Sequence, residues 1–204
     1  MADHPDTPAS RLDERLRRAI DREAKIPHAL DALGPVAGRE VLLLDDTDGL
    51  LADRLIAAGA HVTQISADAL AGGETPGRAG TADVLVVAFA AFRGPGAAEL
   101  AAAQALLRPG GRLLVLHDYG RDDVSRLYGP RPEYGDWSRR DGPFLANGFK
   151  IRVVHSWWTF DSIEEARDLL VNGFGAAGER VGAELTRPRL SYNVAVYHRS
   201  FGAA

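Results

Sequence analysis

The stretch EVLLLDDTDGLLADRLIAAGAHVTQIS, residues 40–66, decides the fold. Residues 41–44 form an uninterrupted apolar run, which is typical of a central parallel strand buried on both faces. Leucines and an isoleucine then follow at helical spacing over residues 50–56, and Gly59 stands where a helix commonly ends. Residues 61–66 have the pattern of a second strand. The stretch therefore predicts a β-α-β unit, whose first turn lies where α/β proteins bind their ligands.

The composition of the 204 residues limits the class of protein. With 46% hydrophobic and 25% charged residues, it is that of an ordinary globular domain. The absence of cysteine excludes disulfides, thiolate metal sites and a cysteine nucleophile. The net charge of −4 gives no general reason to expect a nucleic-acid partner. No apolar run approaches a membrane span of roughly 18 residues, and residues 1–10 do not resemble a secretory signal, so a cytoplasmic protein is expected.

Strands and helices are expected to alternate along the rest of the chain. Buried-strand patterns cover residues 82–89, 112–117, 150–160 and 190–199. Helical patterns cover residues 97–107 and a long stretch that Asp161 should cap. A kink or break is expected in the long helix because Gly173, Gly175 and Gly178 weaken its middle. This alternation predicts an α/β fold, a three-layer, doubly wound and mostly parallel sheet.

The first 38 residues are expected to form a tail and a capping helix before a single domain of residues 39–204. The capping helix should begin at Ser10, which suits an N-cap, and run to about Lys25. Pro27 should interrupt it, because proline in a helix interior removes a hydrogen bond.

Four stretches resemble, in their order along the chain, the motifs of class I S-adenosylmethionine (SAM)-dependent methyltransferases. They are VLLLDDTDG (41–49), GAHVTQIS (59–66), ADVLVVAFAAFR (82–93) and LRPGGRLLVLHDYG (107–120). The resemblance implies a Rossmann-like sheet of seven strands whose last strand is antiparallel. It also implies SAM as cofactor and methyl transfer to a small molecule.

The resemblance further implies where the cofactor would lie. The family's glycine positions in the first motif fall on Asp45, Thr47 and Gly49, so only one glycine is kept. The acid that begins this motif falls on Leu43, and the acid that binds the ribose hydroxyls falls on Ser66. The implied cofactor-binding residues are Asp45, Asp46, Asp48, Gly49, Ser66, Ala67, Asp68, Ala88 and Phe89.

The three acids of the first turn, Asp45, Asp46 and Asp48, allow three interpretations. They could cap the following helix and interact favourably with its dipole. Asp45 could instead pair with the ammonium group of the cofactor, or the carboxylates could hold a hard metal such as magnesium. No metal enters the function that we expect.

Candidate catalytic residues stand at the carboxyl end of the strand at 112–117, the edge where such sheets bind ligands. They are His117, Asp118 and Tyr119. Each could accept a proton from a substrate, but neighbouring strand residues point to opposite faces, so His117 and Asp118 need not act together. A structural role is the alternative for each of them.

Aromatic residues and arginines mark two further features. The roughly neutral segment 119–141 could bind a flat or anionic ligand, act as a lid, or be a surface loop with internal ion pairs. Trp157 and Trp158 lie on an expected strand, so one should face inward and the other outward.

Two hypotheses on function follow from the sequence. In the first, the protein is a SAM-dependent methyltransferase acting on a small molecule, without nucleic-acid or membrane partners. In the second, it is a degenerate member that has lost SAM binding and serves as a binding or scaffold protein, in a homodimer. The replaced glycines favour the second hypothesis, and the order of the motifs favours the first.

Overall fold

The computed structural model describes residues 8–44, 49–66, 79–89 and 92–202, with the backbone alone for residues 8–13. The chain divides into two compact units, and each is described by itself. The main unit comprises residues 24–119, 132–154 and 194–204. The small unit comprises residues 1–23, 120–131 and 155–193.

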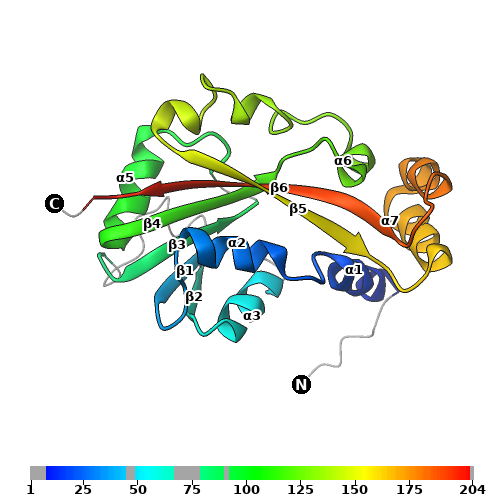
Figure 1. The fold of residues 1–204 in the computed structure, drawn as a ribbon, viewed down its shortest axis with the longest axis horizontal. Coiled ribbons are helices and arrows are strands. Elements are labelled where there is room, and N and C mark those ends of the chain that lie inside the picture. Colours follow the sequence, from blue (N-terminus) through cyan, green and yellow to red (C-terminus); the bar gives the residue numbers. More distant parts are fainter. Residues whose placement is uncertain (1–7, 45–48, 67–78, 90–91, 203–204) are drawn as a thin grey trace. The chain divides into compact units, whose positions relative to one another are not determined.

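A mixed sheet carries the fold, with the strand order β2-β1-β3-β4-β6-β5 (Figure 1). The strands are β1 (Glu40–Leu44), β2 (His61–Ile65), β3 (Ala82–Ala88), β4 (Leu107–Asp118), β5 (Lys150–Thr159) and β6 (Arg189–Ser200). Strands β2, β1, β3 and β4 pair in parallel, whereas β6 pairs with β4 in antiparallel orientation. The mostly parallel sheet with an antiparallel last strand confirms the predicted fold class. The predicted count of seven strands is corrected to six among the residues that the structure describes.

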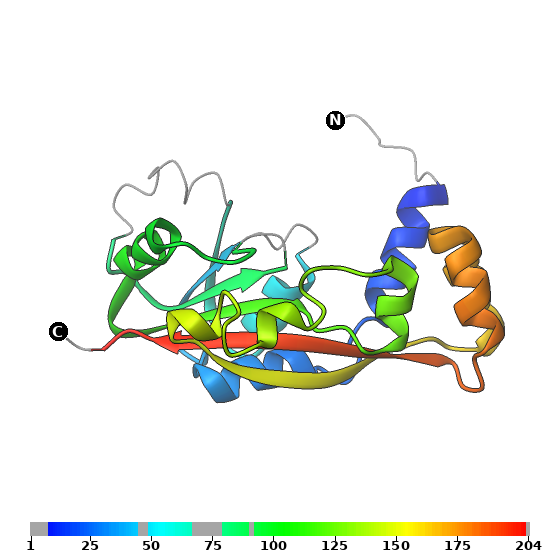
Figure 2. The same cartoon turned by 90° about the horizontal axis from the view of Figure 1, so that it is seen from above.

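Helices cover both faces of the sheet in the main unit. Among the described residues, the α-helices are α1 (Pro8–Ala19), α2 (Lys25–Leu33), α3 (Leu50–Ala57), α5 (Ala97–Leu106), α6 (Asp123–Tyr128) and α7 (Ile163–Ala183), and the short 3₁₀ helices are η1 (Asp136–Ser138) and η2 (Leu145–Asn147). In the main unit, α2 and α5 lie on opposite faces of the sheet (Figure 2). The sheet and the helices on its two faces form the three predicted layers.

The apolar runs are explained by burial on both faces. Leu85 of β3 belongs to the cluster that packs against Leu100 of α5. Its neighbour Val84 points to the other face of the sheet, toward Gly34, which directly follows α2. A Cβ added at Gly34 would lie 3.6 Å from the Val84 side chain. Both strand residues are at most 2% exposed. A strand between two layers needs apolar residues at every position, which is why the sequence shows runs and not alternation.

Helix α3 ends as the sequence predicts. Ala58 is the C-cap, and Gly59 follows with a φ of 90°. The Gly59 N–H donates to the Ile56 carbonyl at 2.9 Å, and the Ala60 N–H donates to the Leu55 carbonyl at 3.0 Å. This is a Schellman motif, in which glycine accepts the left-handed conformation at low cost. The apolar residues at helical spacing over 50–56 were expected to be buried. Leu51 and Leu55 are buried and Leu50 is half-buried, whereas Ile56 is 54% exposed.

The amino-terminal helix differs from its prediction in length. Helix α1 is Pro8–Ala19, so Ser10 lies inside it and is not its N-cap. The helix ends well before Lys25, which instead begins α2. Pro27 lies in the first turn of α2 and does not interrupt a helix, because first-turn N–H groups have no partner inside the helix.

Two helix caps were not foreseen. Ser162, and not Asp161, is the N-cap of α7, and its hydroxyl accepts a hydrogen bond from the Glu165 N–H at 3.0 Å. Asp161 forms an ion pair with Arg22. In the segment 119–141, for which no helix was predicted, Asp122 caps the short helix α6 by accepting from the Ser125 N–H at 2.7 Å.

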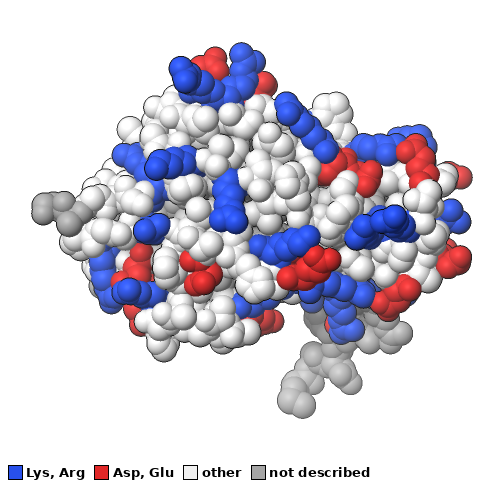
Figure 3. All heavy atoms as spheres, viewed as in Figure 1, with Lys and Arg blue, Asp and Glu red and all other residues white. Residues whose placement is uncertain are grey.

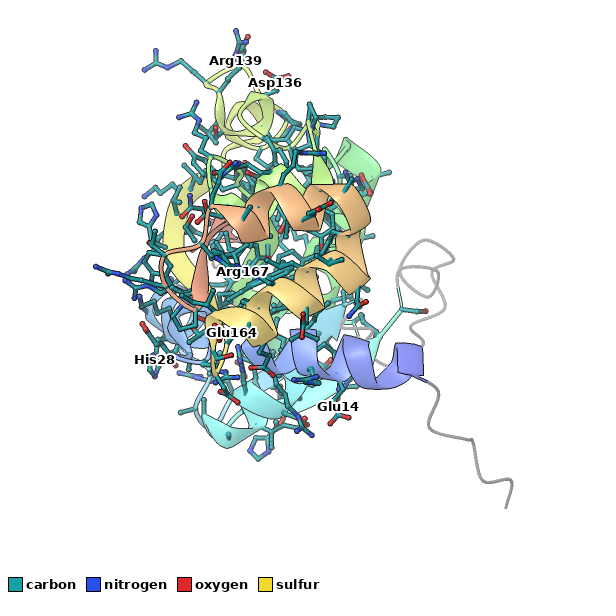
Figure 4. All side chains as sticks on the ribbon, turned by 90° about the vertical axis from the view of Figure 1, so that its right-hand side faces the viewer. Glu14, His28, Asp136, Arg139, Glu164 and Arg167 are labelled. Carbon is teal, nitrogen blue, oxygen red and sulfur yellow. The ribbon has the colours of Figure 1, made fainter. Side chains whose placement is uncertain are left out.

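Helix α7 dominates the small unit and is kinked at a glycine, as predicted. Gly175 has non-helical angles, φ 54° and ψ −130°. Glu164 and Arg167 lie on the first half of the helix (Figure 4). Arg167 donates from Nε to the carbonyl of Gly182 on the second half at 3.0 Å. The two halves therefore pack against each other across the kink.

The two neighbouring tryptophans of β5 face opposite ways, as predicted. Trp158 is only 4% exposed and contacts the rings of Phe174 and Tyr192, all within the small unit. Trp157 is half-buried and carries the guanidinium of Arg189 over its ring.

Charged side chains of both signs are interspersed on the face of the protein shown in Figure 3. Among the described residues, no helix has the length and apolar character needed to cross a bilayer.

Candidate functional site

The candidate site is the carboxyl edge of β1, β3 and β4 in the main unit. Gly49 is the N-cap of α3 there, with a φ of 72°, and no described heavy atom beyond its chain neighbours lies within 4 Å of where its Cβ would be. Ser66 directly follows β2 and is exposed. Five predicted cofactor residues and Thr47 lie outside the described residues: Asp45, Asp46, Asp48, Ala67 and Asp68. Within the described part of this edge, the residue directly before α3 is thus a glycine with a left-handed backbone.

Two phenylalanines shape the edge at the end of β3. Ala88 is buried at 3% exposure, whereas Phe89 is 36% exposed and Phe92 is 2% exposed. Both phenylalanines have left-handed backbones, with φ of 51° and 55°. A bulky residue in this region is strained, and such strain persists only where surrounding contacts hold it. One such contact is the hydrogen bond from the Phe89 N–H to the Leu116 carbonyl at 3.0 Å.

His117 provides a second contact that holds this segment. Its Nε2 lies 3.1 Å from the carbonyl oxygen of Phe92, so the ring carries a hydrogen on Nε2 and donates it. The ring meets Trp137 edge-on at 4.7 Å between centroids and lies 5.7 Å from Phe144. With 2% exposure, the imidazole is a part of the core and joins β4 to the segment after β3.

The surroundings of His117 disfavour its charged form. Burial lowers its pKa from 6.5 to about 4, and the nearby Arg93 guanidinium acts in the same direction. Hydrogen bonding to the backbone of Phe92 and Phe89 and the charge of Glu133 oppose this shift without cancelling it. His117 is therefore neutral at physiological pH and has one ring nitrogen engaged with the backbone.

The sequence did not reveal the cluster around Glu133. This carboxylate is 3% exposed and accepts two hydrogen bonds from Arg93 Nη2, at 3.0 and 2.9 Å. The Arg93 guanidinium also lies 5.3 Å from the ring centroid of Trp137, within cation–π range. Through these contacts, part of the segment 119–141 is anchored beside the end of β3. The alternating arginines and aromatic residues signalled an ordered loop, but not this pairing.

The other predicted catalytic residues are more accessible. Asp118 ends β4 opposite Val194 of β6, and Tyr119 follows it and packs against the apolar core. Both side chains are half-buried. The structure therefore brings His117, Asp118 and Tyr119 to the same end of β4 but gives only the latter two access to solvent.

The comparisons with known proteins agree with this geometry at the level of the fold. No protein-family model matches the sequence, and no curated protein sequence is detectably similar to it. Among solved structures, a candidate type II methyltransferase from Anaeromyxobacter dehalogenans is 16% identical, with a TM-score of 0.52, over 87% of this chain and 97% of that chain. The MccD protein is 13% identical, with a TM-score of 0.51, over 87% of this chain and 96% of that chain.

These identities are too low to carry over a substrate or a catalytic residue, because one fold hosts many functions. The strand order and the antiparallel last strand are those expected of this fold, and the similarity to the two solved structures extends over nearly nine-tenths of the chain. The protein therefore has the Rossmann-like fold of the class I SAM-dependent methyltransferases.

Proposed function

We propose that the protein binds SAM at the carboxyl edge of β1 and β3 in the main unit and transfers its methyl group to a small molecule. The observation that carries the proposal is the turn at Gly49. Gly49 has a left-handed backbone and, apart from its chain neighbours, no described heavy atom within 4 Å of its Cβ position. It lies after β1, which is paired on both sides in a methyltransferase-like sheet. Ligands of open α/β sheets bind at this edge.

The described residues at the edge fit such a cofactor. Gly49 leaves room for the methionine part, and Phe89, at 36% exposure, offers an apolar surface for the adenine. Ser66 stands exposed after β2 and can hydrogen-bond a ribose hydroxyl, although without the charge of an acid. Asp45, Asp46, Asp48, Ala67, Asp68 and Ala88 complete the proposed cofactor site.

The chemistry that SAM supplies is an electrophilic methyl group. The chain's own contribution is to position the substrate and to accept a proton from it. We assign proton acceptance to Asp118 or Tyr119, whose side chains reach solvent. His117 is assigned a positioning role, because its buried imidazole holds the Phe92 carbonyl.

Isothermal titration with SAM and S-adenosylhomocysteine tests the proposal. We expect saturable binding of both ligands, and a Phe89→Ala variant should bind them about tenfold more weakly, since aromatic stacking on a base contributes ~1–3 kcal/mol. Ile56→Ala is the matched control, because Ile56 is an exposed apolar residue on the neighbouring helix. The absence of heat at millimolar ligand, or equal losses in both variants, would argue against the proposed site.

The second candidate function is that of a degenerate member that binds or scaffolds without SAM, in a homodimer. It is favoured by Leu43, which replaces the usual acid and is fully buried in β1. The double variant Asp45→Gly/Thr47→Gly separates the two functions. Gain of SAM binding by the variant alone would favour the degenerate protein, whereas equal binding by both would exclude it.

A further inference from the structure

A cavity of about 330 Å³ lies within the small unit and shares no residue with the proposed SAM site. Residues of α6, β5, the end of α7, the loop that follows α7 and the start of β6 line it. Six of these residues carry the argument that follows: Asp123, Arg126, Trp157, Glu184, Arg187 and Arg189. The volume is at the lower end of the roughly 300–1,000 Å³ that is usual for small-molecule sites.

The two acids of this cavity are already bound by other groups. Glu184 accepts two hydrogen bonds from Arg126 Nη2, both at 2.8 Å. Asp123 accepts from the N–H and the hydroxyl of Ser191, at 2.9 and 2.6 Å. Arg126 Nη1 also lies 3.8 Å from Asp123 Oδ1, so both carboxylates already have a cationic neighbour.

The two remaining arginines have no acidic partner in the part of the chain that the structure describes. They are Arg187, which is exposed, and Arg189, which is half-buried. Together with the pairs above, three guanidinium groups face two carboxylates, so the cavity holds a surplus of positive charge. A guanidinium presents a planar fork of donors that matches a carboxylate or a phosphate.

The aromatic wall is the outward-facing tryptophan of β5. Because Trp158 points into the core, its neighbour Trp157 points to the opposite side of the strand and lines the cavity. The guanidinium of Arg189 lies 4.2 Å from the Trp157 ring centroid. This stack keeps a flat aromatic surface and a cation together at one wall.

We propose that this cavity binds a planar aromatic anion, that is, an aromatic ring carrying a carboxylate or a phosphate group. The ring packs against the wall formed by Trp157 and Arg189, and the anionic group pairs with Arg187. Both parts of the ligand are needed. The wall alone would not select one aromatic ring over another, and the excess positive charge alone would bind any anion weakly.

The indole N–H signals in a two-dimensional ¹H–¹⁵N NMR spectrum test the proposal without SAM. The chain has three tryptophans, and a Trp157→Phe variant identifies the signal of Trp157. Phenyl phosphate and benzoate are the probes. Phenol serves as an aromatic ring without the anionic group, and inorganic phosphate and acetate serve as the two anionic groups without the ring. We expect one or both probes to move the Trp157 signal in a saturable way, and the stronger probe identifies the phosphate or the carboxylate as the natural group. Phenol, phosphate and acetate should bind at least tenfold more weakly, because each lacks one of the two contacts.

Variants decide whether the cavity itself is responsible. Arg187→Ala should weaken binding of the stronger probe about tenfold or more, the effect of losing a charge-assisted hydrogen bond. Arg152→Ala, an exposed arginine of β5 that does not line the cavity, should leave binding unchanged. The proposal is wrong if neither probe moves the Trp157 signal at millimolar concentration. It is equally wrong if inorganic phosphate binds as tightly as phenyl phosphate, or if both arginine variants bind like the natural protein.

Discussion

Acidification from pH 7 to pH 4 is expected to remove about 3 kcal/mol of stability through His117 alone. Its pKa is lowered from 6.5 to about 4 by burial, so the unfolded chain takes up a proton on this side chain at a pH where the folded protein does not. The contribution is fully present above pH 6.5 and is lost as the pH falls through 4. The roughly 2.5 units of difference correspond to about 3 kcal/mol.

A His117→Gln variant isolates this effect from the carboxylates that titrate in the same range. The glutamine amide can still donate to the Phe92 carbonyl, but it does not titrate. Urea unfolding at several pH values should show that the advantage of the natural protein over the variant shrinks by about 3 kcal/mol between pH 7 and pH 4. His28→Gln, which replaces an exposed histidine, is the control. A stability difference between wild type and His117→Gln that stays constant across this range would show that His117 is not buried as described.

The hydrogen bond from His117 to Phe92 also shows what the sequence could not reveal about this histidine. A histidine followed by an aspartate at the carboxyl end of a strand is the pattern of a general base, and the strand itself was predictable from its apolar run. The carbonyl that its Nε2 meets belongs to Phe92, 25 residues earlier in the chain. No local pattern reports a contact over that distance, so the pattern gave the position of His117 but not its surroundings.

The fold was more predictable than the site for the same reason. Buried runs and glycine-ended helices are local signals, and β1, β3 and the Gly59 cap follow them closely. The pairing of Arg93 with Glu133 spans 40 residues, and nothing near either residue indicates it. Site geometry depends on such long-range pairs, whereas strands and caps depend mostly on their own neighbours.

Local signals also failed where two of them competed. Asp161 and Ser162 are both good N-cap residues, and the sequence favoured Asp161. The structure shows Ser162 at the cap and Asp161 paired with Arg22, a residue far away in the sequence. A tertiary ion pair thus decided between two caps of similar intrinsic quality.

Gly178→Ala is expected to destabilise the small unit by about 3 kcal/mol, the upper end of the usual cost of overpacking, because the neighbouring backbone has no room to relax. A Cβ at position 178 would lie 1.9 Å from the carbonyl oxygen of Leu170 and 2.3 Å from its carbonyl carbon. Both atoms belong to the backbone of the first half of α7, so no side-chain rotation can relieve the clash. The halves must separate, and the hydrogen bond from Arg167 to Gly182 should be lost with them.

Gly173→Ala on the same helix is the matched control. Among the described atoms, its added methyl group would meet the Leu16 side chain alone, at 3.3 Å, and a helical alanine gains about 1 kcal/mol over glycine. Because a leucine side chain can move by a few tenths of an ångström, this variant should be within about 1 kcal/mol of the natural protein. Urea unfolding followed by tryptophan fluorescence reports the difference, since Trp158 packs 6.2 Å from Phe174 beside the kink. Equal stability of the two variants would mean that the halves of α7 do not approach each other at Gly178, and the kink at Gly175 would then be a bend without a packed partner.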